Sequence, residues 1–447
     1  MNVVVIFAAG QGTRMKSDLP KVLHTLACKS LLSYVYDVAR VFNPAQIILV
    51  VSPELGDFIH AHPKSIDFPI EELTLAVQHP AKGTGHAMQV AMASIHPGSQ
   101  NVLVLCADVP FVTSEMLSPL IHNTSECCFL GMHVTAPHSY GRMVTEGGKL
   151  LRIVETKDAR GDEQEINYVW SGIMGAKVSF LEKYLPKLSK SSVTGEYYLT
   201  ELVKLANDAD NTDRTTVTHM EALDSSAFKG VNDKAELAAM ENRKQECMRR
   251  HFLEQGVKMI APETVFFAHD TVIDEDVTLM PYITFGKGVY LKKGATILSF
   301  CHIEDSVIEA RASIGPFAHL RGGNHIGEKA AIGNFVEVKK TTMHPKAKAK
   351  HLTYLGDTDV GEGANIGAGT ITCNYDGKNK SKTTIGSKSF IGANVTLIAP
   401  VTIHDGALVA AGSVIIEDVP AGSLALGRAK QVIKEKKGKR RCVELLA

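Results

Sequence analysis

Apolar residues recur every six positions through the C-terminal third of the chain. One run consists of Ile385, Ile391, Leu397, Ile403, Val409 and Ile415, and an earlier run of Ile314, Leu320, Ile326, Ile332 and Val338. A period of six fits neither a lone helix nor a lone strand. It predicts a parallel β-helix in which each flat side contributes one inward apolar residue. A turn follows each flat side, and glycine is frequent there because the turn has little room for a side chain. We expect roughly nine coils between about residues 272 and 415.

The repeat is interrupted twice, near residues 340–358 and 373–384. Because interruptions of a solenoid usually form loops on one face, and such loops often bind ligands, we expect both segments to be loops near a site. Before the repeat, residues 232–254 contain many good helix formers and neither Gly nor Pro, which predicts a linker helix.

The first half of the chain has a different pattern. Residues 3–7, 47–51 and 102–105 are continuous apolar runs, as expected of parallel strands that are covered on both faces. Helical stretches at residues 31–42 and 86–95 lie between them. The alternation predicts a doubly wound, Rossmann-like α/β domain. The expected domains are therefore residues 1–228, a linker helix at 229–255, and a β-helix domain at 256–447 that ends in a basic tail, residues 434–441.

Composition narrows the possible partners. The chain has 447 residues with 48 basic and 48 acidic side chains, so its net charge does not favour nucleic acid as a partner. No apolar run reaches 18 residues, and residues 3–9 suit a buried strand better than a signal peptide, so no membrane segment is expected. The eight cysteines are scattered without a C-x-x-C motif, a pattern that suits a reducing cytoplasm and offers no zinc site.

A glycine-rich loop follows the first strand. Residues 8–15 read A-A-G-Q-G-T-R-M, and Pro20 and Lys21 come shortly afterwards. Glycines let backbone N–H groups approach a phosphate closely, while Arg14 and Lys21 add positive charge. The loop lacks the third glycine of a dinucleotide fingerprint and the G-K-[ST] of a P-loop, so it indicates another kind of nucleotide site.

The G-x-G-T-R-M motif with the following Pro-Lys resembles the signature of sugar-1-phosphate nucleotidyltransferases. Together with the hexad repeat, nearly the whole chain resembles a bifunctional family that joins N-acetylglucosamine-1-phosphate uridyltransferase to glucosamine-1-phosphate N-acetyltransferase. The match is densest in residues 8–26 and 314–428. The resemblance implies acetyl transfer from acetyl-CoA to glucosamine 1-phosphate, then UMP transfer from UTP to the acetylated sugar phosphate. It also implies Mg²⁺, a cytoplasmic homotrimer of left-handed β-helices, and a role in supplying cell-wall and lipopolysaccharide precursors.

The resemblance assigns residues to the nucleotide site. Gln78 and the Gly83-Thr84-Gly85 turn would hold the uracil, Asp108 and Asn232 would bind the metal, and the segments around Gly141 and Glu155 would contact the sugar. The full set of nucleotide and UDP-sugar residues implied is Ala8, Ala9, Gly10, Gly12, Thr13, Arg14, Lys21, Gln78, Gly83, Thr84, Gly141, Glu155 and Asn232.

The acetyl-transfer site centres on His351. An imidazole with an ordinary pKa of ~6.5 suits a general base, and H-L-T-Y-L-G matches the family's catalytic segment. Glu337 is expected to orient this base. The residues implied for the sugar phosphate are Arg321, Lys339, Tyr354 and Asn365. Those implied for acetyl-CoA, in a groove between neighbouring solenoids, are Ala368, Asn374, Tyr375, Lys380, Ala393, Ala411 and Arg428.

Three positions depart from the family pattern. Trp170-Ser171-Gly172 stands where the family has Asn-[Thr/Ser]-Gly, Cys106-Ala107 replaces Tyr-Gly, and Ala393 replaces a common Ser. Because a Trp is far bulkier than the sugar-contacting Asn and has no acceptor, an altered sugar preference or a feeble uridyltransferase is one alternative. A second alternative is a non-catalytic assembly subunit, which would not need His351, Lys339 and Arg321 together.

Overall fold

The computed structural model describes residues 2–63, 66–123, 125–135, 138–209 and 217–434. Two compact units divide the chain at residues 242 and 243, within the linker segment expected at residues 229–255. Most of the basic tail, residues 435–441, lies outside the described part. No helix among the described residues is long and apolar enough to cross a membrane.

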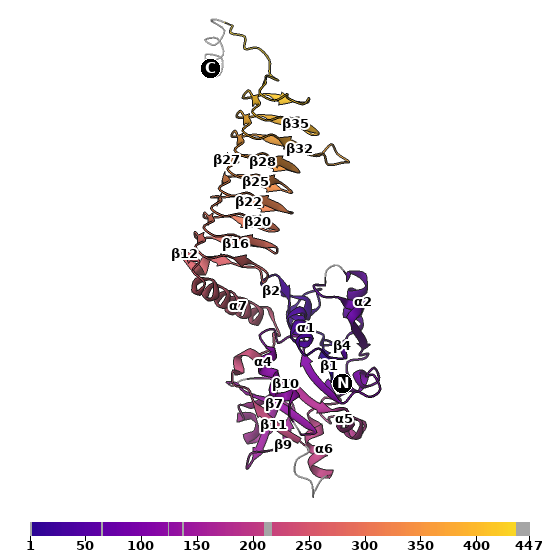
Figure 1. Ribbon diagram of the computed structural model, residues 1–447. Coiled ribbons are helices and arrows are strands. Elements are labelled where there is room, and N and C mark those ends of the chain that lie inside the picture. The colour runs from indigo at the N-terminus through magenta and orange to yellow at the C-terminus, as the bar shows by residue number, and fades with distance from the viewer. Residues whose placement is uncertain (1, 64–65, 124, 136–137, 210–216, 435–447) are drawn as a thin grey trace, which may run out of the picture. The chain divides into compact units, whose positions relative to one another are not determined.

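The first unit is built on a mixed sheet of nine strands in the order β11-β7-β10-β6-β1-β4-β5 (Figure 1), with the hairpin β8–β9 attached to β10. The strands β6, β1, β4 and β5 are parallel, and β10 runs antiparallel to both β6 and β7. The strand bounds are β1 Asn2–Phe7, β4 Gln46–Val51, β5 Leu73–Val77, β6 Asn101–Cys106, β7 Cys127–His133, β8 Arg142–Glu146, β9 Lys149–Val154, β10 Tyr168–Lys177 and β11 Val217–Glu221, with a small hairpin of β2 Thr25–Leu26 and β3 Lys29–Ser30 apart from the sheet.

Helices cover both faces of this sheet, since apolar clusters lie on each side of it. The helices of the chain are α1 Leu31–Val41, α2 Pro53–Ala61, α3 Thr84–Met92, α4 Ser114–Ile121, α5 Val178–Tyr184, α6 Glu201–Ala209 and α7 Lys234–Glu254. The strands β1, β4 and β6 are almost wholly buried, which explains their continuous apolar runs. The predicted doubly wound fold is confirmed, and the carboxyl ends of β1 and β6 meet at the edge where such sheets bind ligands.

The second unit is a parallel β-helix with three sheets, whose strands are stacked coil upon coil in Figure 1. The first sheet contains β12 Lys258–Met259, β15 Thr278–Leu279, β18 Thr296–Ile297, β21 Ser313–Ile314, β24 Ala331–Asn334, β27 Lys348–His351, β30 Asn365–Ile366, β33 Phe390–Ile391, β36 Leu408–Val409 and β38 Leu424–Ala425. The second contains β13 Val265–Phe266, β16 Ile283–Phe285, β19 His302–Ile303, β22 His319–Arg321, β25 Glu337–Lys339, β28 Tyr354–Gly356, β31 Ile371–Cys373, β34 Thr396–Ile398 and β37 Val414–Ile415. The third contains β14 Val272–Ile273, β17 Val289–Leu291, β20 Ser306–Ile308, β23 Asn324–Ile326, β26 Thr342–Met343, β29 Thr358–Val360, β32 Thr383–Ile385 and β35 Val401–Ile403.

The inward residues of this β-helix form one continuous apolar core. The hexad residues Ile314, Ile332, Ile391 and Val409 occupy the same sheet, and all are at most 2% exposed. The C-terminal half of α7 covers the first coil, where Gln245 exchanges two hydrogen bonds of 2.8 Å with the backbone of Phe267. Such a cap protects the end of a solenoid. The predicted β-helix of hexapeptide repeats is therefore confirmed.

One prediction about this unit is wrong. Residues 340–358 do not form a loop but continue the coil as β26, β27 and β28. The hexad phase changes here because the coil is one residue shorter. Thr384 pairs with Thr402 eighteen residues later, whereas Thr342 pairs with Asp359 seventeen residues later. The second interruption is a loop, as predicted, and it joins β31 to β32.

Candidate active sites

The glycine-rich loop of the first unit lines a cavity of about 410 Å³ at the carboxyl ends of β1 and β6. Gly12 has φ +60°, and a Cβ there would lie 2.7 Å from the Cβ of Lys21, so glycine lets the Lys21 side chain pass close to the loop. The predicted residues that line the cavity are Ala8, Ala9, Gly10, Lys21, Gln78, Gly83, Thr84 and Asp108.

Two cations and two oxygen donors meet beside this cavity. The Lys21 ammonium forms an ion pair with the Asp108 carboxylate, and both side chains are less than 20% exposed. Arg14 Nη2 donates a 3.1 Å hydrogen bond to Asn232 Oδ1. The backbone N–H of Val231 donates to the Asp108 carbonyl at 3.0 Å, which brings the segment carrying Asn232 against Asp108. The two predicted metal ligands therefore lie on contacting segments, each bound to a basic side chain.

Hydrogen bonds to other residues of the first unit fix the turn that is predicted to bind uracil. Gln78 is buried, and its Nε2 donates to the Gly83 carbonyl at 2.9 Å. The Thr84 hydroxyl accepts the backbone N–H of Leu199 at 3.0 Å at the start of α3. These contacts fix the turn on one side of the cavity. Glu196 also lines this cavity, and sequence reasoning missed it because no motif surrounds it.

The predicted sugar segments form a second group. Glu155 lies close to Gly141, where an added Cβ would be 3.4 Å from a carboxylate oxygen. The Thr200 hydroxyl donates to Glu155 Oε1 at 2.9 Å, yet burial raises the pKa of this carboxyl. Arg142 is buried and binds the Tyr140 carbonyl at 2.9 Å and the Thr156 hydroxyl, so it ties the two segments together.

In the second unit, three basic side chains gather on one face of the β-helix. Arg321 and Lys339 are paired in register on β22 and β25. The positive charges of Lys380 and Arg321 lower the pKa of Lys339, which shows that the three cations are close. Lys380 comes from the loop between β31 and β32, which folds back through a bridge between Tyr375 and Lys380. A phosphate dianion would relieve the repulsion among these cations.

Neutral hydrogen-bonding groups adjoin this basic cluster. Tyr354 follows Glu337 in register on the same sheet, and burial raises the pKa of its hydroxyl, which keeps it protonated. Asn374 hydrogen-bonds the Tyr354 hydroxyl and donates its amide to Asp357. These side chains can orient the hydroxyl groups of a sugar.

His351 ends β27 and is exposed. Its Nδ1 lies 2.9 Å from Asn334 Oδ1 on the coil below. The Glu337 carboxylate accepts hydrogen bonds of 2.9 and 2.6 Å from Arg321, and its expected role in orienting His351 stays a prediction. Asn365 lies one coil above Lys348 on the same sheet as His351.

The predicted acetyl-CoA residues Ala368, Ala393 and Ala411 lie on successive coils at one corner of the β-helix. The N–H of Asn394 donates to the Ala368 carbonyl at 2.7 Å, and that of Gly412 to the Ala393 carbonyl at 2.8 Å. Arg428 is exposed beyond the last strand, β38. The structure thus places three of these residues in one line and Arg428 at its far end.

Comparison with known proteins covers both units. Residues 4–145 match the family model of the MobA-like NTP transferase domain, and residues 382–417 match bacterial transferase hexapeptide (six repeats). The bifunctional protein GlmU of Jannaschia sp. is 43% identical over 96% of this chain and 93% of its own length. Those of Paracoccus denitrificans and Wolbachia pipientis are each 42% identical over 96% of this chain, and over 95% and 97% of their own lengths. The chain belongs to the GlmU family.

Two departures from the GlmU pattern have different structural settings. Trp170 is 6% exposed, packs edge-on against Phe129 and donates its indole N–H to the Ile173 carbonyl at 3.0 Å. It belongs to the apolar core and does not line the 410 Å³ cavity. Cys106 does line that cavity, where burial raises its thiol pKa to about 12 and keeps it uncharged beside Asp108.

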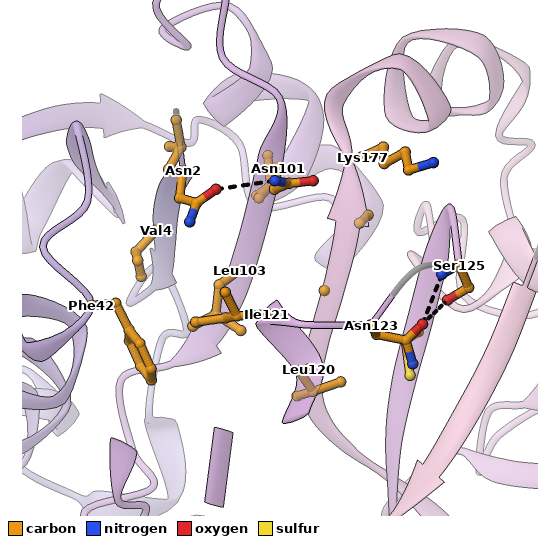
Figure 2. A pocket seen from close by; sticks show the side chains of 15 residues that line it. Asn2, Val4, Phe42, Asn101, Leu103, Leu120, Ile121, Asn123, Ser125 and Lys177 are labelled. Atoms are coloured by element: carbon orange, nitrogen blue, oxygen red, sulfur yellow. Dashed lines mark hydrogen bonds between the residues drawn. The ribbon is translucent and has the colours of Figure 1, made fainter. Parts of the chain in front are cut away.

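Another cavity in the first unit lies at the opposite edge of the sheet. Figure 2 shows its lining, which includes Asn2 and Asn101 at the starts of β1 and β6. Its volume is about 30 Å³, and Asn2 and Asn101 hydrogen-bond each other at 3.0 Å. This volume is too small for a nucleotide or a sugar phosphate.

Proposed function

We propose that this GlmU-family protein makes UDP-N-acetylglucosamine in two steps, at two separate sites. The second unit acetylates glucosamine 1-phosphate with acetyl-CoA, and the first unit then transfers UMP from UTP to N-acetylglucosamine 1-phosphate. The observation that supports the second step best is the meeting of Lys21, Asp108, Arg14 and Asn232 at the glycine-rich loop. Phosphoryl transfer needs such positioning and charge neutralisation more than covalent help from the protein.

In the uridyl transfer, a phosphate oxygen of the sugar phosphate attacks the α-phosphorus of UTP and pyrophosphate leaves. The backbone of the loop and the charges of Arg14 and Lys21 would offset the negative charge that builds up on the leaving group. The buried Gln78–Gly83 turn would hold the base on the other side of the cavity. Glu155 and Gly141 would contact the sugar.

The donor set at Asp108 and Asn232 suits Mg²⁺. A carboxylate and an amide oxygen are hard ligands, and they lie on contacting segments. No group of three His, Cys, Asp or Glu side chains in the described part of the chain could hold a metal alone, so phosphate oxygens of the nucleotide would complete the coordination. Bound there, Mg²⁺ would neutralise phosphate charge.

In the acetyl transfer, the amine of glucosamine 1-phosphate attacks the thioester carbonyl. A C–N bond forms, the C–S bond breaks and CoA leaves as the thiolate, while His351 accepts the proton of the amine. Arg321 and Lys339 would hold the phosphate of the acceptor. Lys380, which the resemblance assigned to acetyl-CoA, would assist them, because the positive charges of Lys380 and Arg321 lower the pKa of Lys339. Tyr354 would position the sugar.

We also propose a homotrimer whose β-helices associate along one corner. The corner residues Tyr282, Phe300, Phe317, Phe335 and Leu352 all have left-handed backbone conformations and are 45–60% exposed. The four rings stack at centroid distances of 5.0, 4.8 and 5.1 Å, which makes a continuous apolar ridge. A ridge of this kind usually marks an interface.

Above His351 the same corner changes character. Its residues become Gly369, Asn394 and Gly412, beside the predicted acetyl-CoA residues Ala368, Ala393 and Ala411. The bulky side chains thus end at the level of His351, and the small ones beyond would leave room for a cofactor in the groove between solenoids.

A cytoplasmic location fits the seven free cysteines of the described part.

The ridge can be tested by replacing Phe317 and Phe335 with serine. The double variant should sediment as a smaller species than the wild type and lose acetyl transfer, but retain uridyl transfer. Val272→Ser serves as the control, because Val272 is 50% exposed on a different sheet. An unchanged sedimentation coefficient in the double variant would contradict the proposed interface.

The uridyl step is tested by measuring pyrophosphate release with Mg²⁺, UTP and several sugar 1-phosphates. Release selective for N-acetylglucosamine 1-phosphate would support the proposal. Release with another sugar would favour the alternative of an altered pocket, for which Trp170 is the motivating residue. If that alternative holds, Trp170→Asn should change the preference, while Trp170→Phe should keep it. Loss of acetyl transfer in a folded His351→Ala would argue against the non-catalytic alternative for the second unit, whereas a persistent rate would point to another base.

A further inference from the structure

His351 and Asn334 share one rung of the β-helix. They are paired in register on β27 and β24, and His351 Nδ1 lies 2.9 Å from Asn334 Oδ1. Both residues line a groove of about 570 Å³ together with Phe317 and Phe335 of the apolar ridge. Lys350 is the other ionisable residue in that lining, and no carboxylate is among the described residues that form it.

The chemistry of this contact fixes the tautomer of the imidazole. An amide oxygen only accepts hydrogen bonds, so Nδ1 must carry the hydrogen in the neutral ring. The unprotonated nitrogen is then Nε2, which is the atom available to take a proton. With the hydrogen on Nε2 instead, neutral His351 could not act as a base at that atom.

The backbone on both sides of the pair is held in place. The buried Thr353 hydroxyl donates to the His351 carbonyl at 2.7 Å. The N–H of Leu352 donates to the Asn334 carbonyl at 3.0 Å. Since both residues also belong to adjacent strands, the amide oxygen and the ring meet without a flexible loop between them.

We infer that Asn334 is a positioning residue for acetyl transfer, holding His351 with Nδ1 protonated and Nε2 free to accept the proton of the attacking amine. The inference rests on the proposed acetyltransferase function with His351 as the base. Asn334 itself exchanges no proton. When His351 becomes protonated, both ring nitrogens donate, and the Nδ1–H bond to Asn334 persists.

The test compares Asn334→Ala, Asn334→Asp and the control Lys348→Ala, an exposed residue on the same strand as His351. Acetyl transfer is measured as thiol release over pH 5.5–9, with thermal unfolding of each variant as a folding check. Asn334→Ala should lower kcat about tenfold or more with little change in KM, since a positioned base contributes about 10²–10⁴-fold. Asn334→Asp should recover most of the rate and move the acidic limb of the pH profile to higher pH, because a carboxylate at Nδ1 favours the imidazolium.

The outcomes separate this inference from the function on which it rests. An inactive wild type, or a fully active His351→Gln, would refute the proposed acetyl transfer with this base. If the wild type is active and His351→Gln is not, the inference is overturned by a wild-type rate in Asn334→Ala. It is equally overturned if Asn334→Asp is folded but leaves the pH profile where it was.

Discussion

The basic residues and the predicted oxygen ligands of the first site bind each other. Lys21 pairs with Asp108 and Arg14 with Asn232, so the side chains proposed to bind phosphate contact those proposed to bind the metal. If the site binds a metal–nucleotide complex as proposed, binding would exchange these partners and release each cation toward a phosphate. Such an exchange would keep the charges of the site compensated both before and after the substrate binds.

Removing the Lys21 side chain should lower the rate of uridyl transfer but raise the affinity for the metal ion. In Lys21→Met, we expect uridyl transfer to fall about 10²–10³-fold, because a charge that stabilises the leaving pyrophosphate is lost. Mn²⁺ titrated without nucleotide should bind ~3- to 10-fold more tightly than to the wild type, since Asp108 no longer has its ion-pair partner. Paramagnetic resonance of free Mn²⁺ measures this affinity. Lys149→Met, at an exposed position of β9, is the control, and weaker Mn²⁺ binding in Lys21→Met would contradict the exchange.

Glu155 should reduce stability at neutral pH. Burial raises its pKa in the folded protein, so the native state binds a proton more readily than the unfolded chain. Stability from this group is therefore present at low pH and lost as pH rises through the folded pKa. Glu155→Gln should raise the unfolding temperature at pH 8 but not at pH 4.5, by about 2–4 °C for each kcal/mol recovered. The exposed Glu146→Gln should show no such difference, and an equal shift at both pH values would argue against burial as the cause.

The sequence motif predicted the glycine loop, Arg14 and Lys21, and the family resemblance added Asp108, but neither predicted how these side chains pair. Lys21 and Asp108 come together because β1 and β6 are neighbours in the sheet, and Arg14 meets Asn232 through the segment that contacts Asp108. Glu337 was assigned to His351 on resemblance, whereas the coil register places Asn334 beside the imidazole. Such contacts depend on tertiary register, which local spacing does not contain.

The hexad period predicted the coils well, since each inward position is set by the repeat itself. It failed where a coil has seventeen residues in place of eighteen, as between Thr342 and Asp359. Losing one residue at a turn shifts the phase of the pattern without disturbing the strand pairing. A phase change in a solenoid sequence therefore indicates a loop only when the added length is large, as it is between β31 and β32.

The coils stack so closely that many of their turns leave no room for a side chain, which explains why glycine occurs there. A Cβ on Gly361 would lie 2.4 Å from the backbone nitrogen of Ser387 on the next coil. Gly361→Ala should therefore destabilise the second unit by about 1–3 kcal/mol, the cost of overpacking. In contrast, Gly56→Ala in α2, where the nearest atom is Val51 Cγ2 at 3.6 Å, should be neutral or stabilising by up to about 1 kcal/mol.

Urea unfolding followed by circular dichroism measures both glycine variants. Gly361 lies at a turn away from His351, on the coil edge between β29 and β30, so its effect on stability is separable from the acetyl site. If Gly361→Ala unfolds at the wild-type urea concentration, the coils are not held at the spacing that the structure shows.

Each unit of the molecule contains its own apolar core and one of the two proposed reaction sites. The apolar cluster of the β-helix runs from Phe252 to Val419, and the clusters of the α/β unit end at Met240. The product of the proposed acetyl transfer is the acceptor in the uridyl transfer, so the two sites are linked by a small molecule. Nothing in either reaction requires that this molecule stay on the chain that made it.

Two defective variants should therefore restore the overall synthesis when mixed. Lys21→Met should acetylate but not transfer UMP, and His351→Ala should do the reverse. With glucosamine 1-phosphate, acetyl-CoA, UTP and Mg²⁺, each alone should form almost no UDP-N-acetylglucosamine, which chromatography quantifies. An equimolar mixture should form it after a lag, while N-acetylglucosamine 1-phosphate accumulates in solution, and adding that intermediate should abolish the lag. As a control for an intact first site, His351→Ala should form UDP-N-acetylglucosamine when it receives N-acetylglucosamine 1-phosphate with UTP and Mg²⁺. If both partial activities are present but the mixture makes no product, the intermediate passes between the sites without entering solution, because free diffusion would have supplied it to the second protein.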